Sequence, residues 1–436
     1  MKLLFVSLGC DKNLVDSEEM LGLLTGNGFE IVDDETEAEA IVVNTCCFIN
    51  DAKEESVNTI LEMAEYKKTG SCKVLVVTGC MAQRYKNEII EEVPEVDAVL
   101  GTTSYGDILK AIREAMEGKH FQEFKDIDYL PEKLGKRVLT TGGHFGYLKI
   151  AEGCDKHCTY CIIPYARGPV RSLSLEQAVE QTRQLAAEGY REIVLTGIEI
   201  SSWGHDFKNG QSLIDLLEAL SAAAPEVRLR LGSLEPRTVT EDFCRRAAAL
   251  PNLCPQFHLS MQSGCDATLK RMNRKYDTAR YLESVELLNR WFDRPAVTTD
   301  LITGFPEETE EEFAQTLDFI RKCRFAQMHI FPYSIRPGTP AAKMEQVPKA
   351  VKEERARRAA AVAEEMHRSY LEGCVGRTYP VLFEQPKNGK FFGHAPNYME
   401  VLVDGAELHN ALKNVRIVDV DGEALLGEIV EQEAEA

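Results

Sequence analysis

Three cysteines in the first 80 residues each follow a short run of aliphatic residues. The runs are KLLFVSLGC, which ends at Cys10, EAIVVNTC, which ends at Cys46, and KVLVVTGC, which ends at Cys80. Such runs are typical of strands buried on both faces of a parallel sheet, and the carboxyl ends of these strands meet at one edge. Three thiolates at one edge predict an iron–sulfur cluster in which one iron has no protein ligand. A zinc site completed by water or histidine is the weaker alternative, because no histidine lies near these cysteines.

A second group of cysteines lies in the stretch GYLKIAEGCDKHCTYCIIPYARG, as Cys154, Cys158 and Cys161. Their spacing is C-x-x-x-C-x-x-C, so one short loop could wrap a single cubane and again leave one iron open. A zinc site normally has four ligands, and no fourth cysteine follows at a usable spacing. This motif resembles the signature of the radical S-adenosylmethionine (SAM) superfamily. The resemblance implies that SAM binds the open iron and is cleaved to a 5′-deoxyadenosyl radical.

Strand-like and helix-like stretches alternate over residues 145–340, in about six units. The alternation predicts an incomplete TIM-like (β/α)6 barrel with its chemistry at the carboxyl ends of the strands. The residues expected to form a SAM pocket there are Tyr160, Gly197, Glu199, Ser233, Glu235, Gln262, Asp300 and Gly304. The two glycines would let the backbone approach the cofactor. Glu199 or Glu235 could hold its ammonium group or its ribose hydroxyls, and Tyr160 could pack on its adenine.

The elements that position the first three cysteines are predicted to form a doubly wound parallel sheet with one helix after each strand. A helical pattern starts at Ser17, and Asp16 before it is a good N-cap residue. A second helical pattern starts at Asp51.

The last 90 residues have a different texture. Residues 347–372 predict a charged, alanine-rich helix whose basic run, from Lys352 to Arg358, could face a partner. From about residue 373, short strands and turns predict a small β-barrel. Residues 374–436 hold five Lys and Arg against eleven Asp and Glu. An acidic barrel favours a basic protein surface over RNA as its partner.

Composition narrows the class of protein. The chain has 436 residues, a net charge of −20 and 13 cysteines. The charge opposes binding to nucleic acid, and cysteine usage of this kind in a cytosolic chain indicates metal ligation or redox chemistry. No apolar run approaches the ~20 residues of a membrane span, and the opening run is shorter than the ~7–15 residues of a signal-peptide core. We expect a soluble, cytoplasmic protein with no membrane partner.

The three-part layout resembles the methylthiotransferase family. The resemblance covers essentially the whole chain and implies an N-terminal methylthiotransferase domain (1–125), a radical SAM domain (140–345), a linker helix (346–372) and a TRAM domain (373–436). It implies two [4Fe–4S] clusters that take part in catalysis, together with SAM. The ligands of the first cluster would be Cys10, Cys46 and Cys80, and those of the second would be Cys154, Cys158 and Cys161.

Within this family, SLGCDKNLVDSEEMLG and NTCCFINDAKEES are similar to the branch that acts on ribosomal protein S-twelve of the small subunit. That branch converts an aspartate to its β-methylthio derivative. The implied partners are this basic protein, or the ribosome that carries it, and an electron donor of unknown identity. One SAM would methylate a sulfur species at the first cluster, and a second SAM would generate the radical that removes a hydrogen from the β-carbon.

Two alternatives remain open. The other main branch of the family modifies the isopentenyl-adenosine of tRNA, and it usually has an arginine-containing stretch where this chain has Phe48-Ile49-Asn50. The second alternative is a non-catalytic iron–sulfur electron carrier or scaffold. The polar residues expected at the barrel's strand ends argue against it.

Overall fold

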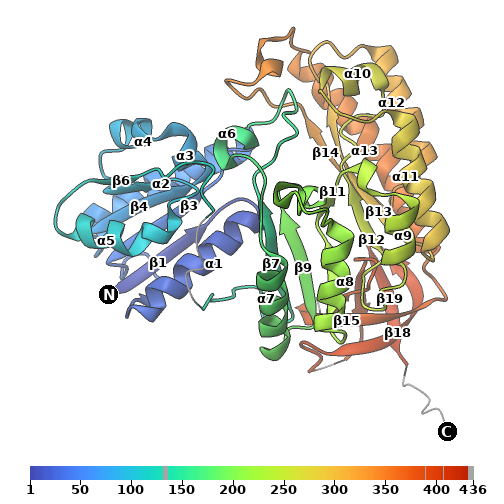
Figure 1. The fold of residues 1–436 in the computed structure, drawn as a ribbon, viewed down its shortest axis with the longest axis horizontal. Coiled ribbons are helices and arrows are strands. Elements are labelled where there is room, and N and C mark those ends of the chain that lie inside the picture. The colour runs from blue at the N-terminus through green and yellow to red at the C-terminus, as the bar shows by residue number, and fades with distance from the viewer. Residues whose placement is uncertain (131–135, 388, 406, 431–436) are drawn as a thin grey trace.

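The computed structural model describes residues 1–130, 136–387, 389–405 and 407–430. It shows an N-terminal α/β unit, a central half-barrel and a C-terminal β-barrel (Figure 1). The expected fold class is confirmed: a parallel sheet, an incomplete TIM-like barrel and a closed five-stranded barrel follow one another along the chain. No helix within the described residues is both long enough and apolar enough to cross a membrane.

The N-terminal unit is a six-stranded sheet in the order β2-β1-β3-β4-β5-β6, in which every pairing is parallel. Its strands are β1 (Lys2–Ser7), β2 (Glu30–Ile31), β3 (Ala40–Thr45), β4 (Val74–Gly79), β5 (Ala98–Leu100) and β6 (Phe121–Glu123). Its helices are α1 (Asp11–Gly26), α2 (Asn50–Thr69), α3 (Cys80–Tyr85), α4 (Asn87–Glu92) and α5 (Ile108–Met116).

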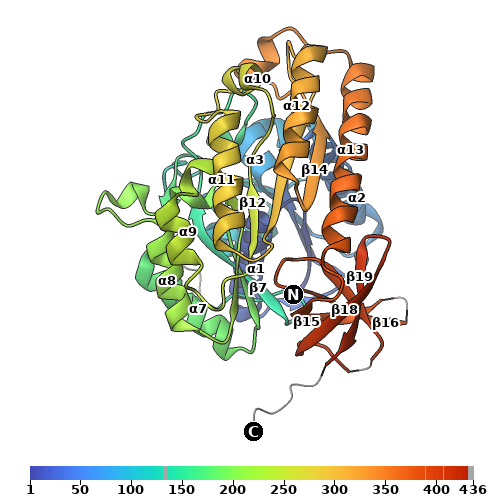
Figure 2. The same cartoon turned by 90° about the vertical axis from the view of Figure 1, so that its right-hand side faces the viewer.

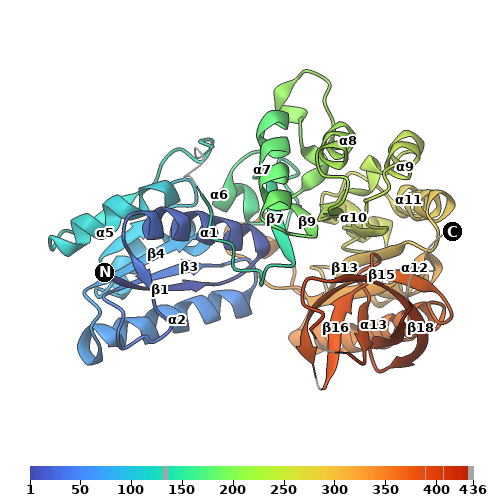
Figure 3. The ribbon, with the colours of Figure 1, turned by 90° about the horizontal axis from the view of Figure 1, so that it is seen from below.

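Both faces of this sheet are covered, which explains the continuous apolar runs in its strands. Every residue of β3 and β4 is buried. Successive side chains of a strand point to opposite faces, so Val42 packs in the core beside α1 and α5, whereas Val43 packs in the core beside α2. Figure 3 shows α1 and α2 on opposite sides of the sheet.

The start of the first helix differs from the expectation. Helix α1 begins at Asp11, with Cys10 in the N-cap position, so the prediction that Asp16 caps a helix starting at Ser17 is wrong. Asp16 lies inside α1, is buried, and forms ion pairs with Lys149 and Arg167 of the central unit. An aspartate can cap a helix or form an ion pair with a distant residue. Here the ion pairs with Lys149 and Arg167 determine the position of Asp16.

The central unit consists of two four-stranded sheets, β10-β9-β7-β8 and β11-β12-β13-β14. The strands are β7 (Phe145–Glu152), β8 (Arg171–Ser172), β9 (Glu192–Gly197), β10 (Arg228–Leu231), β11 (Ser233–Leu234), β12 (Gln256–Leu259), β13 (Ala296–Thr303) and β14 (Gln327–Pro332). The third predicted strand is split at Gly232 into β10, which pairs with β9, and β11, which pairs with β12. The split strand thereby belongs to both sheets, and only β8 runs antiparallel to its neighbour.

Helices cover the outer face of these sheets. They are α7 (Leu175–Ala187), α8 (Leu213–Ala223), α9 (Glu241–Ala247), α10 (Asp266–Arg271), α11 (Thr278–Trp291) and α12 (Glu310–Cys323). The short helix α6 (Ile163–Arg167) instead contacts α3 of the N-terminal unit. Short 3-10 turns are η1 (Tyr105–Asp107), η2 (Ile200–Ser202), η3 (His205–Phe207), η4 (Pro236–Thr238) and η5 (Pro340–Lys343). A capping box starts α7 at Ser174 and Gln177, and another starts α12 at Thr309 and Glu312.

The long helix α13 (Lys349–Glu372) packs beside α12 and against β14 (Figure 2). The suggestion that its basic run faces a partner is wrong for the two residues that are buried. Lys352 donates to the carbonyl of Tyr333 at 3.2 Å, and Arg355 pairs with Glu308 at 2.9 Å. The run therefore fastens α13 to the half-barrel.

The C-terminal unit is a closed barrel in the order β15-β16-β17-β19-β18. Its strands are β15 (Thr378–Lys387), β16 (Lys390–His394), β17 (Glu400–Val403), β18 (Leu412–Asp421) and β19 (Ala424–Ile429). It is fastened to the half-barrel by two buried arginines of β10. Arg228 donates to the carbonyl of Pro380 at 3.0 Å, and Arg230 donates to the carbonyl of Pro396 at 3.2 Å. The carboxylate of Glu192 holds both arginines.

Candidate active site

The first three cysteines lie where three adjacent parallel strands end. Cys10 follows β1 and precedes α1, Cys46 follows β3, and Cys80 is the first residue of α3 after β4. Two glycines let the loops approach. A Cβ on Gly9 would lie 2.7 Å from Cys46 Cβ, and a Cβ on Gly79 would lie 2.5 Å from the carbonyl oxygen of Thr45. Both glycines have φ near +90°, a conformation that side chains disfavour.

Two of the three cysteines of this group, Cys46 and Cys80, are buried, whereas Cys10 is exposed. Burial raises the pKa of Cys46, and burial raises the pKa of Cys80 to about 11 although the Arg167 guanidinium opposes the rise. A thiol of this kind becomes a thiolate when a metal centre replaces its proton. The donor set, three sulfurs beside a buried cation, therefore fits an anionic iron–sulfur cluster.

The second group of cysteines lies on the loop between β7 and α6. The loop is held closed by a hydrogen bond from Cys154 N to the carbonyl of Gly168 at 3.0 Å and by one from Cys161 N to the carbonyl of Cys158 at 3.0 Å. Burial raises the pKa of Cys154 to about 12 and that of Cys161 to about 11. Arg274 Nη1 lies 3.2 Å from Cys158 Sγ, so a half-buried guanidinium also accompanies these sulfurs. This donor set likewise fits an anionic cluster.

Within the described part of the chain, no three His, Cys, Asp or Glu side chains are grouped as a single metal ion would require. Cysteines that ligate an iron–sulfur cluster each bind a different iron, so their sulfurs need not meet at one point. The fit of each group to a cluster therefore rests on its three sulfurs and on the guanidinium that contacts one of them.

One cavity of about 1640 Å³ joins the two groups. All six cysteines line it, together with residues of the half-barrel and of the C-terminal barrel, among them Glu384, His394 and Tyr398. Since ligand cavities are commonly about 300–1,000 Å³, this one has room for a cofactor and part of a macromolecular substrate together.

Six of the eight predicted pocket residues line this cavity: Tyr160, Glu199, Ser233, Glu235, Gln262 and Asp300. Gly197 and Gly304 do not line it. The space beside Gly304 is occupied by Lys352, whose Cγ would lie 2.4 Å from an added Cβ, and the space beside Gly197 is bounded by the carbonyl of Ala151 at 3.1 Å. The SAM contacts of all eight stay predictions.

Polar contacts fix several of these side chains. Lys156 lies between two carboxylates, 3.4 Å from Glu199 and 3.9 Å from Glu235. Burial disfavours ionisation of Asp300, but the hydrogen bond and charge of His258, 3.3 Å away, lower the pKa of Asp300. The cavity wall thus presents ordered carboxylates suited to ammonium and hydroxyl groups.

Sequence reasoning missed several basic residues of the cavity, among them Lys12, Lys156, Arg167, Arg274 and Arg336. Lys12 and Lys156 each lie within two residues of a predicted cysteine ligand, which is a usable signal. Arg274 is more than 100 residues from the sulfur that it contacts, and only the fold brings the two together.

Comparison with known proteins places these features in a family. Residues 2–101 match the model described as uncharacterized protein family UPF0004, and residues 148–320 match the radical SAM superfamily. The ribosomal protein uS12 methylthiotransferase RimO of Lachnoclostridium phytofermentans is 46% identical over 404 residues, which cover 91% of this chain and 92% of that protein. The protein of the same name from Alkaliphilus oremlandii is 39% identical over 398 residues, covering 91% and 89%.

Two solved structures share the fold. The radical SAM methyltransferase TsrM of Kitasatospora setae, with cobalamin and a [4Fe–4S] cluster bound, has a TM-score of 0.57 at 15% identity and covers 78% of this chain and 77% of its own. The cobalamin-dependent SAM radical enzyme OxsB has a TM-score of 0.54 at 14% identity, with coverage of 85% and 56%. At these identities the likeness concerns the fold alone.

Proposed function

We propose that this chain, which belongs to the RimO family of radical SAM methylthiotransferases, attaches a methylthio group to the β-carbon of an aspartate in ribosomal protein uS12. The chain is a radical SAM enzyme that uses SAM and two [4Fe–4S] clusters. The observation that carries the proposal is the single cavity lined by both groups of three cysteines. In it, a sulfur-bearing site and a radical-generating site face one substrate position.

The residues divide the work as follows. Cys10, Cys46 and Cys80 hold the cluster that presents sulfur, and Cys154, Cys158 and Cys161 hold the cluster that binds SAM. When bound, these cofactors supply methyl transfer to sulfur and reductive formation of the radical. Glu199, held by Lys156, and Glu235, held by Arg237 at 2.8 Å, bind polar groups of SAM. Asp300, held by His258, does so on the opposite strands.

The C-terminal barrel supports a basic protein as the substrate. Three of its five basic residues already form ion pairs. Five of its acidic residues are exposed and, among the described residues, have no ion-pair partner: Glu407, Asp419, Asp421, Glu423 and Glu428. Such a surface attracts a basic protein and repels the phosphates of RNA. Because barrel residues also line the cavity, a protein held by the barrel can reach the cysteines.

The test is to incubate reduced, cluster-loaded enzyme and SAM separately with small ribosomal subunits, free uS12 and tRNA. Mass spectrometry should find one hydrogen replaced by a methylthio group on one aspartate of uS12, and no change in tRNA. A product on tRNA alone would overturn the proposed substrate. Comparing the two uS12 samples decides whether the free protein or the assembled subunit is recognised.

A further inference from the structure

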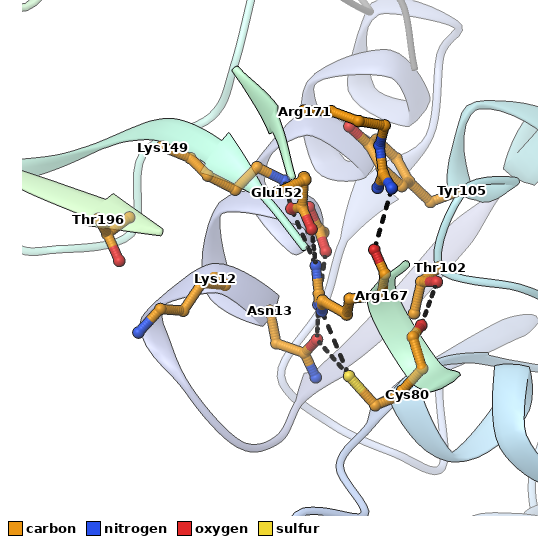
Figure 4. A network of polar contacts seen from close by, with 12 residues as sticks. Lys12, Asn13, Cys80, Thr102, Tyr105, Lys149, Glu152, Arg167, Arg171 and Thr196 are labelled. Atoms are coloured by element: carbon orange, nitrogen blue, oxygen red, sulfur yellow. Dashed lines mark hydrogen bonds and ion pairs between the residues drawn. The ribbon is translucent and has the colours of Figure 1, made fainter. Parts of the chain in front are cut away.

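Arg167 is the most completely buried charged side chain at the junction of the two cysteine groups, with 1% of its surface exposed. It is the last residue of α6, six positions after Cys161. Its guanidinium nevertheless points into the N-terminal unit, where Nε lies 3.3 Å from Cys80 Sγ (Figure 4). A residue of the helix that follows the radical SAM loop thus donates a hydrogen bond to a sulfur of the other predicted cluster.

The other donors of Arg167 fix this orientation. Nη1 lies 2.9 Å and 3.0 Å from the two carboxylate oxygens of Glu152 on β7. Nη2 donates to Asn13 Oδ1 and lies 2.9 Å from Asp16 Oδ2, both on α1. Partners on α1, α3 and β7 therefore hold the guanidinium from three sides, and its contact to sulfur is part of this network.

The charges of this network are balanced apart from the sulfur. Lys149 pairs with Asp16 and lies 2.6 Å from Glu152, so two cations face two carboxylates. Lys149 donates to no cysteine in the described structure, whereas Arg167 does. Arg167 therefore differs from Lys149 in donating a hydrogen bond directly to a predicted ligand of the cluster.

We propose that Arg167 is a positioning residue that raises the reduction potential of the N-terminal cluster through its hydrogen bond to Cys80. Reduction adds a negative charge to a cluster and its thiolates, and a hydrogen bond from a buried cation stabilises the more negative state. Hydrogen bonds to cluster sulfurs are among the factors that set the potentials of such centres. Because Arg167 ends the helix that directly follows the radical SAM loop, the segment that holds the ligands of one cluster also adjusts the other cluster.

The inference rests on the cluster assignment of the proposed function, and the test separates the two. Full-length protein carrying C154A, C158A and C161A should retain about four irons, all in the N-terminal cluster. Absence of iron from this protein would count against the assignment itself. A titration of its potential, monitored by electron paramagnetic resonance, tests Arg167.

In this background, R167Q should lower the equilibrium constant for reduction of the N-terminal cluster by about tenfold. For one electron, this corresponds to a reduction potential lower by about 59 mV. R167K keeps the charge but loses the Nε donor, and should lower the reduction potential less than R167Q does. K149Q removes an equal charge from the same network without touching a sulfur, and should lower it less than R167Q does. If R167Q does not retain iron, R167Q/E152Q, which keeps the Lys149–Asp16 pair, is titrated instead with the same expected shift.

A crossed control uses full-length protein with C10A, C46A and C80A, which carries only the radical SAM cluster. There R167Q should leave the potential unchanged. The proposal is overturned if R167Q leaves the N-terminal potential at its original value, if K149Q lowers it as much as R167Q does, or if R167Q shifts the other cluster equally.

Discussion

Replacing Glu192 by glutamine should destabilise the half-barrel and loosen the C-terminal barrel from it. Glu192 is the first residue of β9 and is buried, with its carboxylate 2.6 Å from Arg228 Nη2 and 2.7 Å from Arg230 Nε. The same two arginines donate to backbone carbonyls of the C-terminal barrel. E192Q keeps the shape of the side chain but leaves two buried guanidinium groups without an anion.

Two independent arguments give the expected loss of unfolding free energy. Removing one partner of a buried ion pair costs about 3–5 kcal/mol of unfolding free energy. Independently, burial disfavours the charged form of Glu192, but Arg230 and Arg228 lower its pKa to about 2. An ordinary glutamate has a pKa near ~4.3, so the difference of about two units corresponds to about 3 kcal/mol. Because the folded pKa is the lower one, this stabilisation is complete above the unfolded pKa and is lost only as the pH falls toward 2.

Urea unfolding followed by tryptophan fluorescence measures this loss, since both tryptophans, Trp203 and Trp291, belong to the half-barrel. We expect the E192Q midpoint to fall by about 1 M with an unchanged slope. The difference in unfolding midpoint between E192Q and the original protein should stay constant between about pH 6 and about pH 8. D242N, which breaks an exposed pair with Arg245, is the control and should cost less than ~1 kcal/mol. A shift no larger than that of D242N would refute the reasoning.

Three further outcomes are expected. C10A should abolish methylthio transfer but leave SAM cleavage, measured as 5′-deoxyadenosine; loss of cleavage alone would contradict the assigned division between the clusters. G79A should lower the iron content of the N-terminal site and reduce the unfolding free energy by about 1–3 kcal/mol, because an added Cβ meets the carbonyl of Thr45 at a positive φ. Iron analysis measures the first effect and equilibrium unfolding the second. A normal iron content would count against the close approach. K156A should raise the KM for SAM roughly tenfold, because Glu199 loses its neighbouring cation, although Glu235 keeps Arg237 at 2.8 Å. An unchanged KM would place SAM elsewhere.

The architecture was predictable because its signals are local. The runs ending at Cys10, Cys46 and Cys80 predict buried parallel strands, and β1, β3 and β4 lie side by side with those cysteines at their ends. The strand-like stretches of the centre and of the C-terminal barrel correspond to β7 and β9 to β19. Hydrophobic periodicity is a property of a few neighbouring residues, so the sequence displays it directly.

The polar contacts were not predictable, because each joins residues far apart in the chain. Asp16 fits a helix cap locally, yet its partners lie more than 130 residues away. Lys352 and Arg355 belong to an ordinary charged helix until α13 packs on the half-barrel and buries them. Periodicity contains no information about which distant charge a side chain will meet.

The contacts of Arg167 also bear on how this chain can be recombined with its relatives. The expected domain bounds, 1–125 and 140–345, would make the N-terminal and radical SAM parts two separate modules. The seam between them is polar, however, and one arginine on the second module holds an amide, a carboxylate and a thiol on the first. A chimera that crosses over in the connecting segment takes the arginine from one parent and its three partners from the other. A working chimera therefore has to take Arg167 and its three partners from the same parent, or carry compatible residues at these positions. The two units are less independent than the domain layout suggests.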